Sequence, residues 1–181
     1  MQKRVVVGIV GVIVVVGIVS FVHQKFVGRE MTSPESSQQD NAHIVSGTFD
    51  KKKFKTDEQW KKILTSQQYH ILREQGTEIP FTGALEHEKR KGTYYSVGCN
   101  EPVFRSEQKY DSGTGWPSFW APIKPDALVL REDTSLGEVR IEVLDKCGGH
   151  LGHVFDDGPQ PTGKRYCMNS VALYFVPDKK Q

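Results

Sequence analysis

The apolar residues of this chain follow different patterns along its length. Residues 5–22 form an uninterrupted run of 18 residues made of Val, Ile, Gly and Phe with one serine, Ser20. A polar stretch rich in Ser, Gln, Asp, Asn and Lys follows, and from residue 54 onward apolar positions recur in short periodic groups. These changes divide the chain into a basic flank (1–4), an apolar segment (5–22), a polar tether (23–53) and a globular domain (54–181).

Two short helices are expected at the start of the globular domain. Thr56 and Gln59 have the spacing of a capping box, which predicts a helix over about residues 57–64. Ser66 is expected to cap a second amphipathic helix, and Gly76 is expected to end it.

Beyond residue 83 the pattern is that of a β protein. Short alternating runs lie between Gly, Pro and Asp clusters, at residues 93–97, 127–130, 138–144 and 165–176. In the third run Val139, Ile141 and Val143 alternate with charged residues, so one face of that sheet is expected to be wet. The chain shows no βαβ rhythm, and we predict a mainly β domain.

The apolar segment predicts an association with membranes. Its 18 residues are long enough for a transmembrane helix, and no small-x-small cleavage pattern follows them. Lys3 and Arg4 precede the segment, which favours a cytoplasmic N-terminus and an exported domain, periplasmic or extracytoplasmic. We therefore expect a membrane-anchored protein, and the alternative is a signal sequence that is cleaved near Ser20 to give a secreted protein.

The charge balance argues against a nucleic-acid partner. The chain carries 24 basic and 22 acidic side chains, and Lys3 and Arg4 in the flank account for the excess. The remaining chain has no basic surplus that would attract a polyanion.

Cys167 lies at the polar end of the last predicted strand. On a strand Arg165, Cys167 and Asn169 share one face, which continues into apolar residues. Positive charges beside a sulfur, here Arg165 and Lys164, favour the nucleophilic thiolate form. The sequence therefore predicts a reactive thiol at the rim of the core, and the alternative is a buried cysteine that serves as a small apolar residue.

Four separated motifs support the reactive thiol. They occupy residues 76–83 (GTEIPFTG), 109–120 (KYDSGTGWPSFW), 147–159 (CGGHLGHVFDDGP) and 163–170 (GKRYCMNS). With these motifs in this order, the chain resembles the B-type methionine sulfoxide reductases over about residues 56–177. The resemblance implies two antiparallel sheets with short N-terminal helices. It also implies reduction of the R epimer of methionine sulfoxide in oxidised proteins, with an external thioredoxin-like thiol as reductant and no tightly bound cofactor.

The chemistry implied by the resemblance requires a nucleophile and a source of protons. Cys167 is expected to attack the sulfoxide and to become a sulfenic acid. His153 or Asp157 is expected to supply or relay the proton, and the resemblance selects His153. Asn169 is expected to donate a hydrogen bond to the substrate or to orient a water, and Arg165 to tune the thiol or to pair with Asp157.

The resemblance also assigns an apolar pocket for the substrate methyl group, with Trp116 and Phe155 as its walls. His150 is expected to be a structural histidine that is hydrogen-bonded under a loop. On a regular strand it would lie on the face opposite His153, unless a glycine such as Gly152 bends the chain.

The chain departs from the family pattern at two places. Many relatives carry a second, resolving cysteine before the Gly-Trp-Pro sequence, where this chain has Thr114. Other relatives bind structural zinc through two C-x-x-C pairs, whereas the matching quartets 96–99 (SVGC) and 144–147 (LDKC) each keep only the second cysteine. Zinc is therefore not expected. Cys99 and Cys147 are expected to form a disulfide, and the alternatives are two reduced core cysteines or a resolving role for Cys99.

A second function remains open at this point. A non-catalytic module that binds methionine sulfoxide, or one that stores redox state in Cys99 and Cys147, would explain much of the same pattern. Such a module would have no need of Cys167 beside Lys164 and Arg165.

Overall fold

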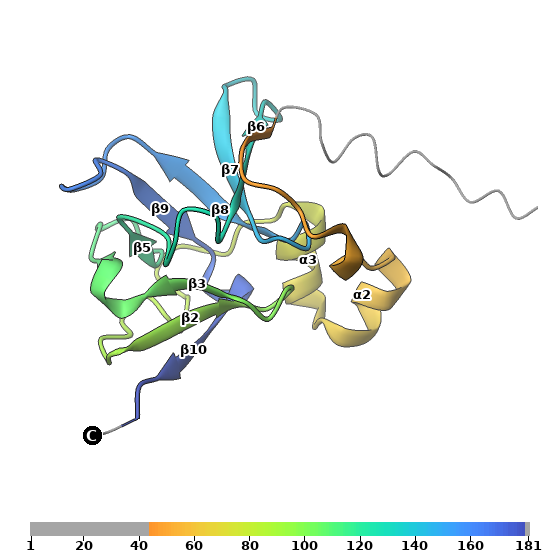
Figure 1. Ribbon diagram of the computed structural model, residues 1–181, viewed down its shortest axis with the longest axis horizontal. Coiled ribbons are helices and arrows are strands. Elements are labelled where there is room, and N and C mark those ends of the chain that lie inside the picture. Colours follow the sequence, from red (N-terminus) through yellow and green to blue (C-terminus); the bar gives the residue numbers. More distant parts are fainter. Residues whose placement is uncertain (1–43, 180–181) are drawn as a thin grey trace, which may run out of the picture. The chain divides into compact units, whose positions relative to one another are not determined.

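Two antiparallel sheets form the framework of the computed structural model, which describes residues 44–179 (Figure 1). The larger sheet has seven strands: β1 (Ile44–Ser46), β4 (Lys109–Tyr110), β5 (Ser118–Phe119), β6 (Val129–Asp133), β7 (Arg140–Leu144), β8 (His150–Phe155) and β9 (Arg165–Met168). The smaller sheet contains β2 (Gly92–Ser96), β3 (Pro102–Arg105) and β10 (Leu173–Pro177). The strand order in the larger sheet is β1-β6-β7-β8-β9-β5-β4, and the order in the smaller sheet is β10-β2-β3. The prediction of a mainly β fold with two antiparallel sheets is confirmed.

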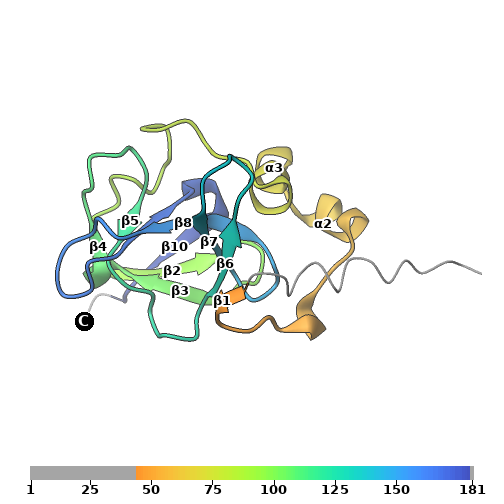
Figure 2. The ribbon, with the colours of Figure 1, turned by 90° about the horizontal axis from the view of Figure 1, so that it is seen from above.

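The two predicted helices are present as α2 (Asp57–Ile63) and α3 (Ser66–Glu74), and they lie together at one end of the sheets (Figure 2). The capping box of Thr56 and Gln59 forms as predicted. The second helix is capped by Thr65, one residue before the predicted Ser66, because the Thr65 hydroxyl accepts from the Gln68 N–H. Three single 3₁₀ turns complete the described elements: η1 (Lys51–Lys53), η2 (Ser106–Gln108) and η3 (Ser170–Ala172).

Residues 44–53, which composition assigns to the tether, are part of the folded domain. Strand β1 pairs with β6, and the Asp50 N–H donates to the Lys146 carbonyl at 2.9 Å. The predicted membrane segment, residues 5–22, lies outside the described residues. Among residues 44–179 no helix is long and apolar enough to cross a bilayer.

The hydrophobic core anchors the strands that carry the predicted nucleophile. Phe119 of β5 stacks on Phe104 of β3, with ring centroids 4.2 Å apart, and Met168 of β9 is fully buried in the same cluster. Each such side chain contributes about 2 kcal/mol through removal of apolar surface from water. Because side chains alternate along β9, burial of Met168 turns Cys167 to the opposite, more open face.

The predicted strand over residues 165–176 is wrong as a single element. It divides into β9 of the larger sheet and β10 of the smaller one, with η3 between them. The break occurs because the N–H groups of Ser170 and Val171 donate to the Glu78 carboxylate instead of to a neighbouring strand. Cys167 and the apolar residues of β10 therefore do not share one sheet face.

The prediction of a wet face on β7 is also wrong. Glu142, which alternation places in water, is 1% exposed, whereas Val139 is 70% exposed. Buried charges occur where partners are available, and Glu142 has Arg131 and His150 as partners within 3 Å. The binary pattern fails here because the polar face of β7 is covered by these side chains.

Candidate active site

Cys167 lies in the middle of the larger sheet, between two neighbouring strands. In the register of the sheet it is opposite His153 of β8 and Ser118 of β5. Its side chain is partly buried, and it is the one cysteine of the chain that is not in a disulfide. The fold thus presents a single free thiol at a partly open position.

A pocket of about 170 Å³ opens beside this thiol. Five of the residues that the sequence nominates contribute to its wall: Trp116, His153, Phe155, Cys167 and Asn169. Thr77, Arg140, Gly152 and Met168 complete it. Arg165 and Asp157 are not part of the wall, so the structure brings together five of the seven nominated residues.

Glu78 holds one side of the pocket together. Its backbone carbonyl accepts the Trp116 indole N–H at 3.1 Å, and its backbone N–H donates to the Asn169 side-chain oxygen at 3.0 Å. Its carboxylate accepts from the N–H groups of Ser170 and Val171. Burial raises the pKa of Glu78, although these two hydrogen bonds oppose the shift. Glu78 therefore fixes the indole and the chain after Cys167 in one geometry.

Asn169 is almost fully buried, and both the nitrogen and the oxygen of its side-chain amide form hydrogen bonds with backbone groups. Its nitrogen donates to the Leu151 carbonyl at 3.1 Å, while its oxygen accepts from Glu78. The side-chain nitrogen carries two hydrogens, so one remains besides the hydrogen that the Leu151 carbonyl accepts. Asn169 thus positions the pocket and retains one donor.

Arg165 supports the pocket from outside. Its guanidinium donates two hydrogen bonds of 2.8 Å to the Asp157 carboxylate and lies 4.3 Å from the centre of the Phe155 ring. The hydrogen bond to Asp157 raises the pKa of Arg165, although burial opposes the shift. Asp157 therefore orients Arg165, and Arg165 in turn covers Phe155.

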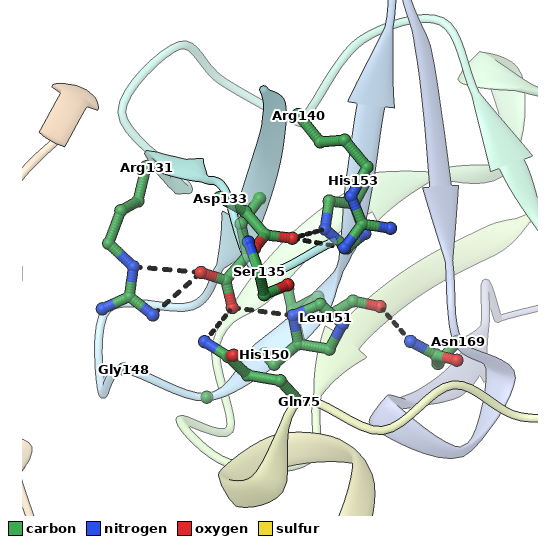
Figure 3. A network of polar contacts seen from close by, with 12 residues as sticks. Gln75, Arg131, Asp133, Ser135, Arg140, Gly148, His150, Leu151, His153 and Asn169 are labelled. Atoms are coloured by element: carbon green, nitrogen blue, oxygen red, sulfur yellow. Dashed lines mark hydrogen bonds and ion pairs between the residues drawn. The ribbon is translucent and has the colours of Figure 1, made fainter. Parts of the chain in front are cut away.

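His153 is paired with a carboxylate that sequence reasoning did not nominate. Its Nε2 lies 2.8 Å from Asp133 Oδ2, and Arg140 donates to the same oxygen (Figure 3). Burial alone would raise the pKa of Asp133, but hydrogen bonds from Ser135 and His153 hold it well below its usual range. Because an ionised carboxylate only accepts, Nε2 of His153 carries the hydrogen and Nδ1 of the neutral ring is a base.

The protonation of His153 is set mainly by its burial. Burial lowers the pKa of His153, whereas the hydrogen bond to Asp133 acts in the opposite direction. A histidine with a lowered pKa is neutral near pH 7 and releases a proton readily once it has taken one up. This behaviour suits a group that relays a proton.

A second histidine–carboxylate pair lies next to the first. His150 Nδ1 is 2.8 Å from Glu142 Oε1, and both side chains are almost completely buried. Burial opposes ionisation of Glu142, but His150 and Arg131 outweigh it and lower the pKa of Glu142. His150 is thus a hydrogen-bonded buried histidine, as expected.

The two histidine rings meet although alternation would separate them. Their centroids are 5.3 Å apart because a bulge in β8 places Leu144 opposite His150 and Val143 opposite Gly152. Gly152 is needed there, since a Cβ would lie 2.1 Å from the Cys167 carbonyl oxygen. The glycine thereby permits both the bulge and the close approach of β8 to β9.

The other two cysteines form a separate, closed corner. Cys99 and Cys147 are joined in a disulfide, the first of the three arrangements expected from the sequence. The Asp145 carboxylate accepts from the backbone N–H groups of Cys99 at 3.1 Å and of Cys147 and Gly149 at 2.9 Å. One buried side chain therefore binds the two turns that the disulfide links.

This corner does not fit a metal ion in its disulfide form. Among residues 44–179, Cys99, Asp145 and Cys147 form the one group of Cys, His, Asp or Glu residues with three donor atoms within 4.8 Å. Both sulfurs are already bonded to each other, so neither offers the thiolate charge that zinc requires.

Several site residues escaped the sequence analysis. Glu78 and Thr77 lie inside the first motif, which supported the family resemblance but assigned no function to either residue. Asp133, Arg140 and Glu142 lie outside all four motifs. The alternation of β7 even placed Arg140 and Glu142 in water. No local pattern distinguishes these residues from surface charges, since their partners come from other strands.

Comparisons with known proteins agree with the geometry of the pocket. A SelR domain model matches residues 64–177. The peptide methionine sulfoxide reductase MsrB of Methanosarcina barkeri is 54% identical over 127 residues, which cover 70% of this chain and 89% of that protein. The protein of the same name from Leptospira interrogans is 56% identical over 122 residues, 67% of this chain and 93% of its own length.

Proposed function

Since the chain belongs to the B-type methionine sulfoxide reductases and reduces methionine sulfoxide with thiols, we propose that Cys167 is the thiol that attacks the substrate. The observation that carries this assignment is that the one cysteine outside a disulfide lies in the wall of the pocket, with His153 and Trp116. A non-catalytic binding module would not require this combination of a free thiol and a proton relay.

The proposed reaction transfers one oxygen atom from the substrate to Cys167. The thiol proton passes to Nδ1 of His153, and Asp133 stabilises the resulting imidazolium through its hydrogen bond at Nε2. The thiolate attacks the sulfoxide sulfur, the sulfur–oxygen bond of the substrate breaks as oxygen moves to Cys167, and the proton returns to that oxygen. Methionine leaves, and Cys167 remains as a sulfenic acid.

Substrate binding in this proposal uses the apolar and amide groups of the wall. Trp116 and Phe155 enclose the methyl group, since the indole is held by the Glu78 carbonyl and the phenyl ring by Arg165. The free amide hydrogen of Asn169 donates to the sulfoxide oxygen. A fixed indole costs less conformational entropy on binding than a mobile one.

Exposed apolar residues beside the pocket support an oxidised polypeptide as the substrate. Ile79 and Phe81, which follow Thr77 of the wall, are 71% and 64% exposed. Phe81 has a left-handed backbone with a φ of 64°, which bulky residues rarely adopt, and its N–H donates to the Gly115 carbonyl. Strain that keeps an aromatic ring in water is typical of binding segments. We expect these side chains to contact residues that flank the oxidised methionine.

The sulfenic acid is resolved by an external thiol in this proposal. Cys99 and Cys147 already bond to each other, and Thr114 occupies the position of the resolving cysteine. A thioredoxin-like reductant attacks the sulfenic sulfur, releases water and forms a mixed disulfide, which its second thiol then reduces.

The location of the protein is part of the same proposal. We propose that residues 5–22 anchor the chain in a membrane with the catalytic domain exported, and the alternative is secretion after cleavage. The Cys99–Cys147 disulfide supports an oxidising compartment. An alkaline wash of membranes tests the anchor, because an anchored protein stays in the pellet with its N-terminus intact and a secreted one is recovered in solution.

The catalytic assignment is tested with the two epimers of a blocked methionine sulfoxide. The wild-type protein should reduce the R epimer with dithiothreitol, and one equivalent without reductant should leave Cys167 trapped by dimedone. Cys167→Ser should abolish both, since a hydroxyl is a poor nucleophile toward sulfur. Turnover by Cys167→Ser would refute the assignment.

A further inference from the structure

Three hydroxyl groups lead from the Cys167 sulfur into the protein. Thr114 Oγ1 lies 3.8 Å from Cys167 Sγ, and Ser112 Oγ lies 2.8 Å from Thr114 Oγ1. Ser112 Oγ also lies 2.8 Å from Ser118 Oγ, and Ser118 donates to the Trp116 carbonyl at 3.2 Å. Ser118 is completely buried and is opposite Cys167 in the sheet register. The sulfur therefore stands at one end of a continuous hydrogen-bonded chain.

The direction of this chain follows from the fact that each hydroxyl has a single hydrogen. Because Ser118 donates to the Trp116 carbonyl, its oxygen accepts from Ser112, and Ser112 in turn accepts from Thr114. Thr114 then has no hydrogen left for the sulfur, so the thiol S–H donates to Thr114. This direction fits the protonated state of Cys167.

The thiolate has no hydrogen to donate and requires the opposite direction. Thr114 can turn its hydrogen toward the sulfur if Ser112 donates to Thr114 and Ser118 donates to Ser112. The reversal gives up the 3.2 Å bond to the Trp116 carbonyl and gains a hydrogen bond to a charged sulfur. Hydrogen bonds to ionised groups are roughly twice as strong as neutral ones, so the exchange favours the thiolate.

We propose that Thr114 is a catalytic residue that donates a hydrogen bond to the Cys167 thiolate, and that Ser112 and Ser118 reverse their hydrogen bonds to allow it. This row of hydrogen bonds stabilises the charge on the sulfur and does not conduct protons, because the backbone carbonyl of Trp116 at its far end cannot take a proton up. The thiol proton leaves on the pocket side, where His153 lies. Residue 114, which is the resolving cysteine in other family members, thus stabilises the nucleophile Cys167 in this protein.

The proposal rests on Cys167 as the nucleophile, and its test does not depend on turnover. The alkylation rate of Cys167 by iodoacetamide at pH 7 is measured in the full chain by mass spectrometry of the Cys167 peptide. Cys99 and Cys147 do not compete because they are bonded to each other. Thr114→Val, which keeps the shape and removes the hydroxyl, should slow alkylation about tenfold, as expected for loss of one charge-assisted hydrogen bond.

Two matched variants separate the hydrogen bond from packing. Thr114→Ser keeps the hydroxyl and should react at nearly the wild-type rate, whereas Ser112→Ala interrupts the chain behind Thr114 and should give an intermediate rate. An unchanged rate in Thr114→Val, or an equal loss in Thr114→Ser and Thr114→Val, would overturn the proposal. If Thr114→Val fails to fold, the rate of Ser112→Ala decides, and a wild-type value there also overturns it. Failure of the proposed function would instead be seen as turnover by Cys167→Ser.

Discussion

The three cysteines of this protein lie in two regions with opposite construction. Cys167 is partly open, lies next to the Thr114 hydroxyl and contributes to the wall of a pocket together with His153. Cys99 and Cys147 are buried or nearly so, bonded to each other and held by a carboxylate that accepts three backbone N–H groups. The first region leaves the Cys167 sulfur free to react, whereas in the second region the sulfurs of Cys99 and Cys147 are bonded to each other and cannot act as nucleophiles.

Each region contains a buried carboxylate, Glu142 beside the histidines and Asp145 in the disulfide corner, and the two differ in their partners. Glu142 and Asp145 lie three residues apart, and each is 1% exposed. Burial opposes ionisation of both, but His150 and Arg131 lower the pKa of Glu142, whereas Asp145 has only neutral donors and burial raises its pKa. The comparison shows that the partners of a buried acid decide its charge, and burial alone does not.

The largest expected effect comes from opening the disulfide corner. Replacing Cys99 and Cys147 together by Ala should reduce the free energy of unfolding by about 4 kcal/mol, because the bond links residues 48 positions apart. Turnover of the R sulfoxide with dithiothreitol should fall less than about threefold at a temperature where the variant is folded. Urea unfolding and steady-state kinetics measure the two quantities. Loss of turnover in the folded variant would show that the two regions are not independent.

The carboxylates should respond to pH in opposite directions. A lowered pKa means that Glu142 contributes stability above its ordinary value of 4.5, and that this contribution is lost as the pH falls through the folded value. Glu142→Gln should therefore cost about 3 kcal/mol at neutral pH and less in acid. A raised pKa means that Asp145 contributes stability in acid that is lost as the pH rises, so Asp145→Asn should cost more in acid than at pH 7.

Urea unfolding of both variants and the wild type between about pH 7 and pH 3 measures these costs. The wild type is compared at every pH, because other groups titrate over the same range. Equal slopes for Glu142→Gln and Asp145→Asn would contradict the contrast between the two regions.

The smallest expected effect concerns the exposed side of the active region. Phe81→Ser should lower kcat/KM about fivefold for a peptide with apolar residues beside methionine sulfoxide, because apolar contact area is lost. The same variant should reduce a blocked single methionine sulfoxide at the wild-type rate. Ile63→Ser on α2 is the matched control, since Ile63 is 59% exposed. An equal loss for both substrates in Phe81→Ser would contradict a role in polypeptide binding.

Local signals predicted those parts of the protein that depend on neighbours in sequence. The capping box of Thr56 and Gln59 needs no distant partner and forms as predicted, and strands β2 and β6 overlap the short runs predicted over residues 93–97 and 127–130. The strand over residues 165–176 was predicted wrongly because Glu78, far away in sequence, binds the backbone N–H groups of Ser170 and Val171. The exposure of Glu142 was predicted wrongly for a similar reason, since Arg131 and His150 lie on other strands.

The sequence by itself determined the family and nominated Cys167 and the residues that could surround it, because four motifs combine glycine, aromatic and polar residues at particular spacings. Only the tertiary structure decided which of these residues meet. It separated Arg165 and Asp157 from the wall of the pocket, paired His153 with Asp133, and connected Thr114 to Ser118 through Ser112. The physical reason is that these contacts join strands distant in the chain, so their distances depend on sheet register, on a bulge in β8 and on the packing of the core.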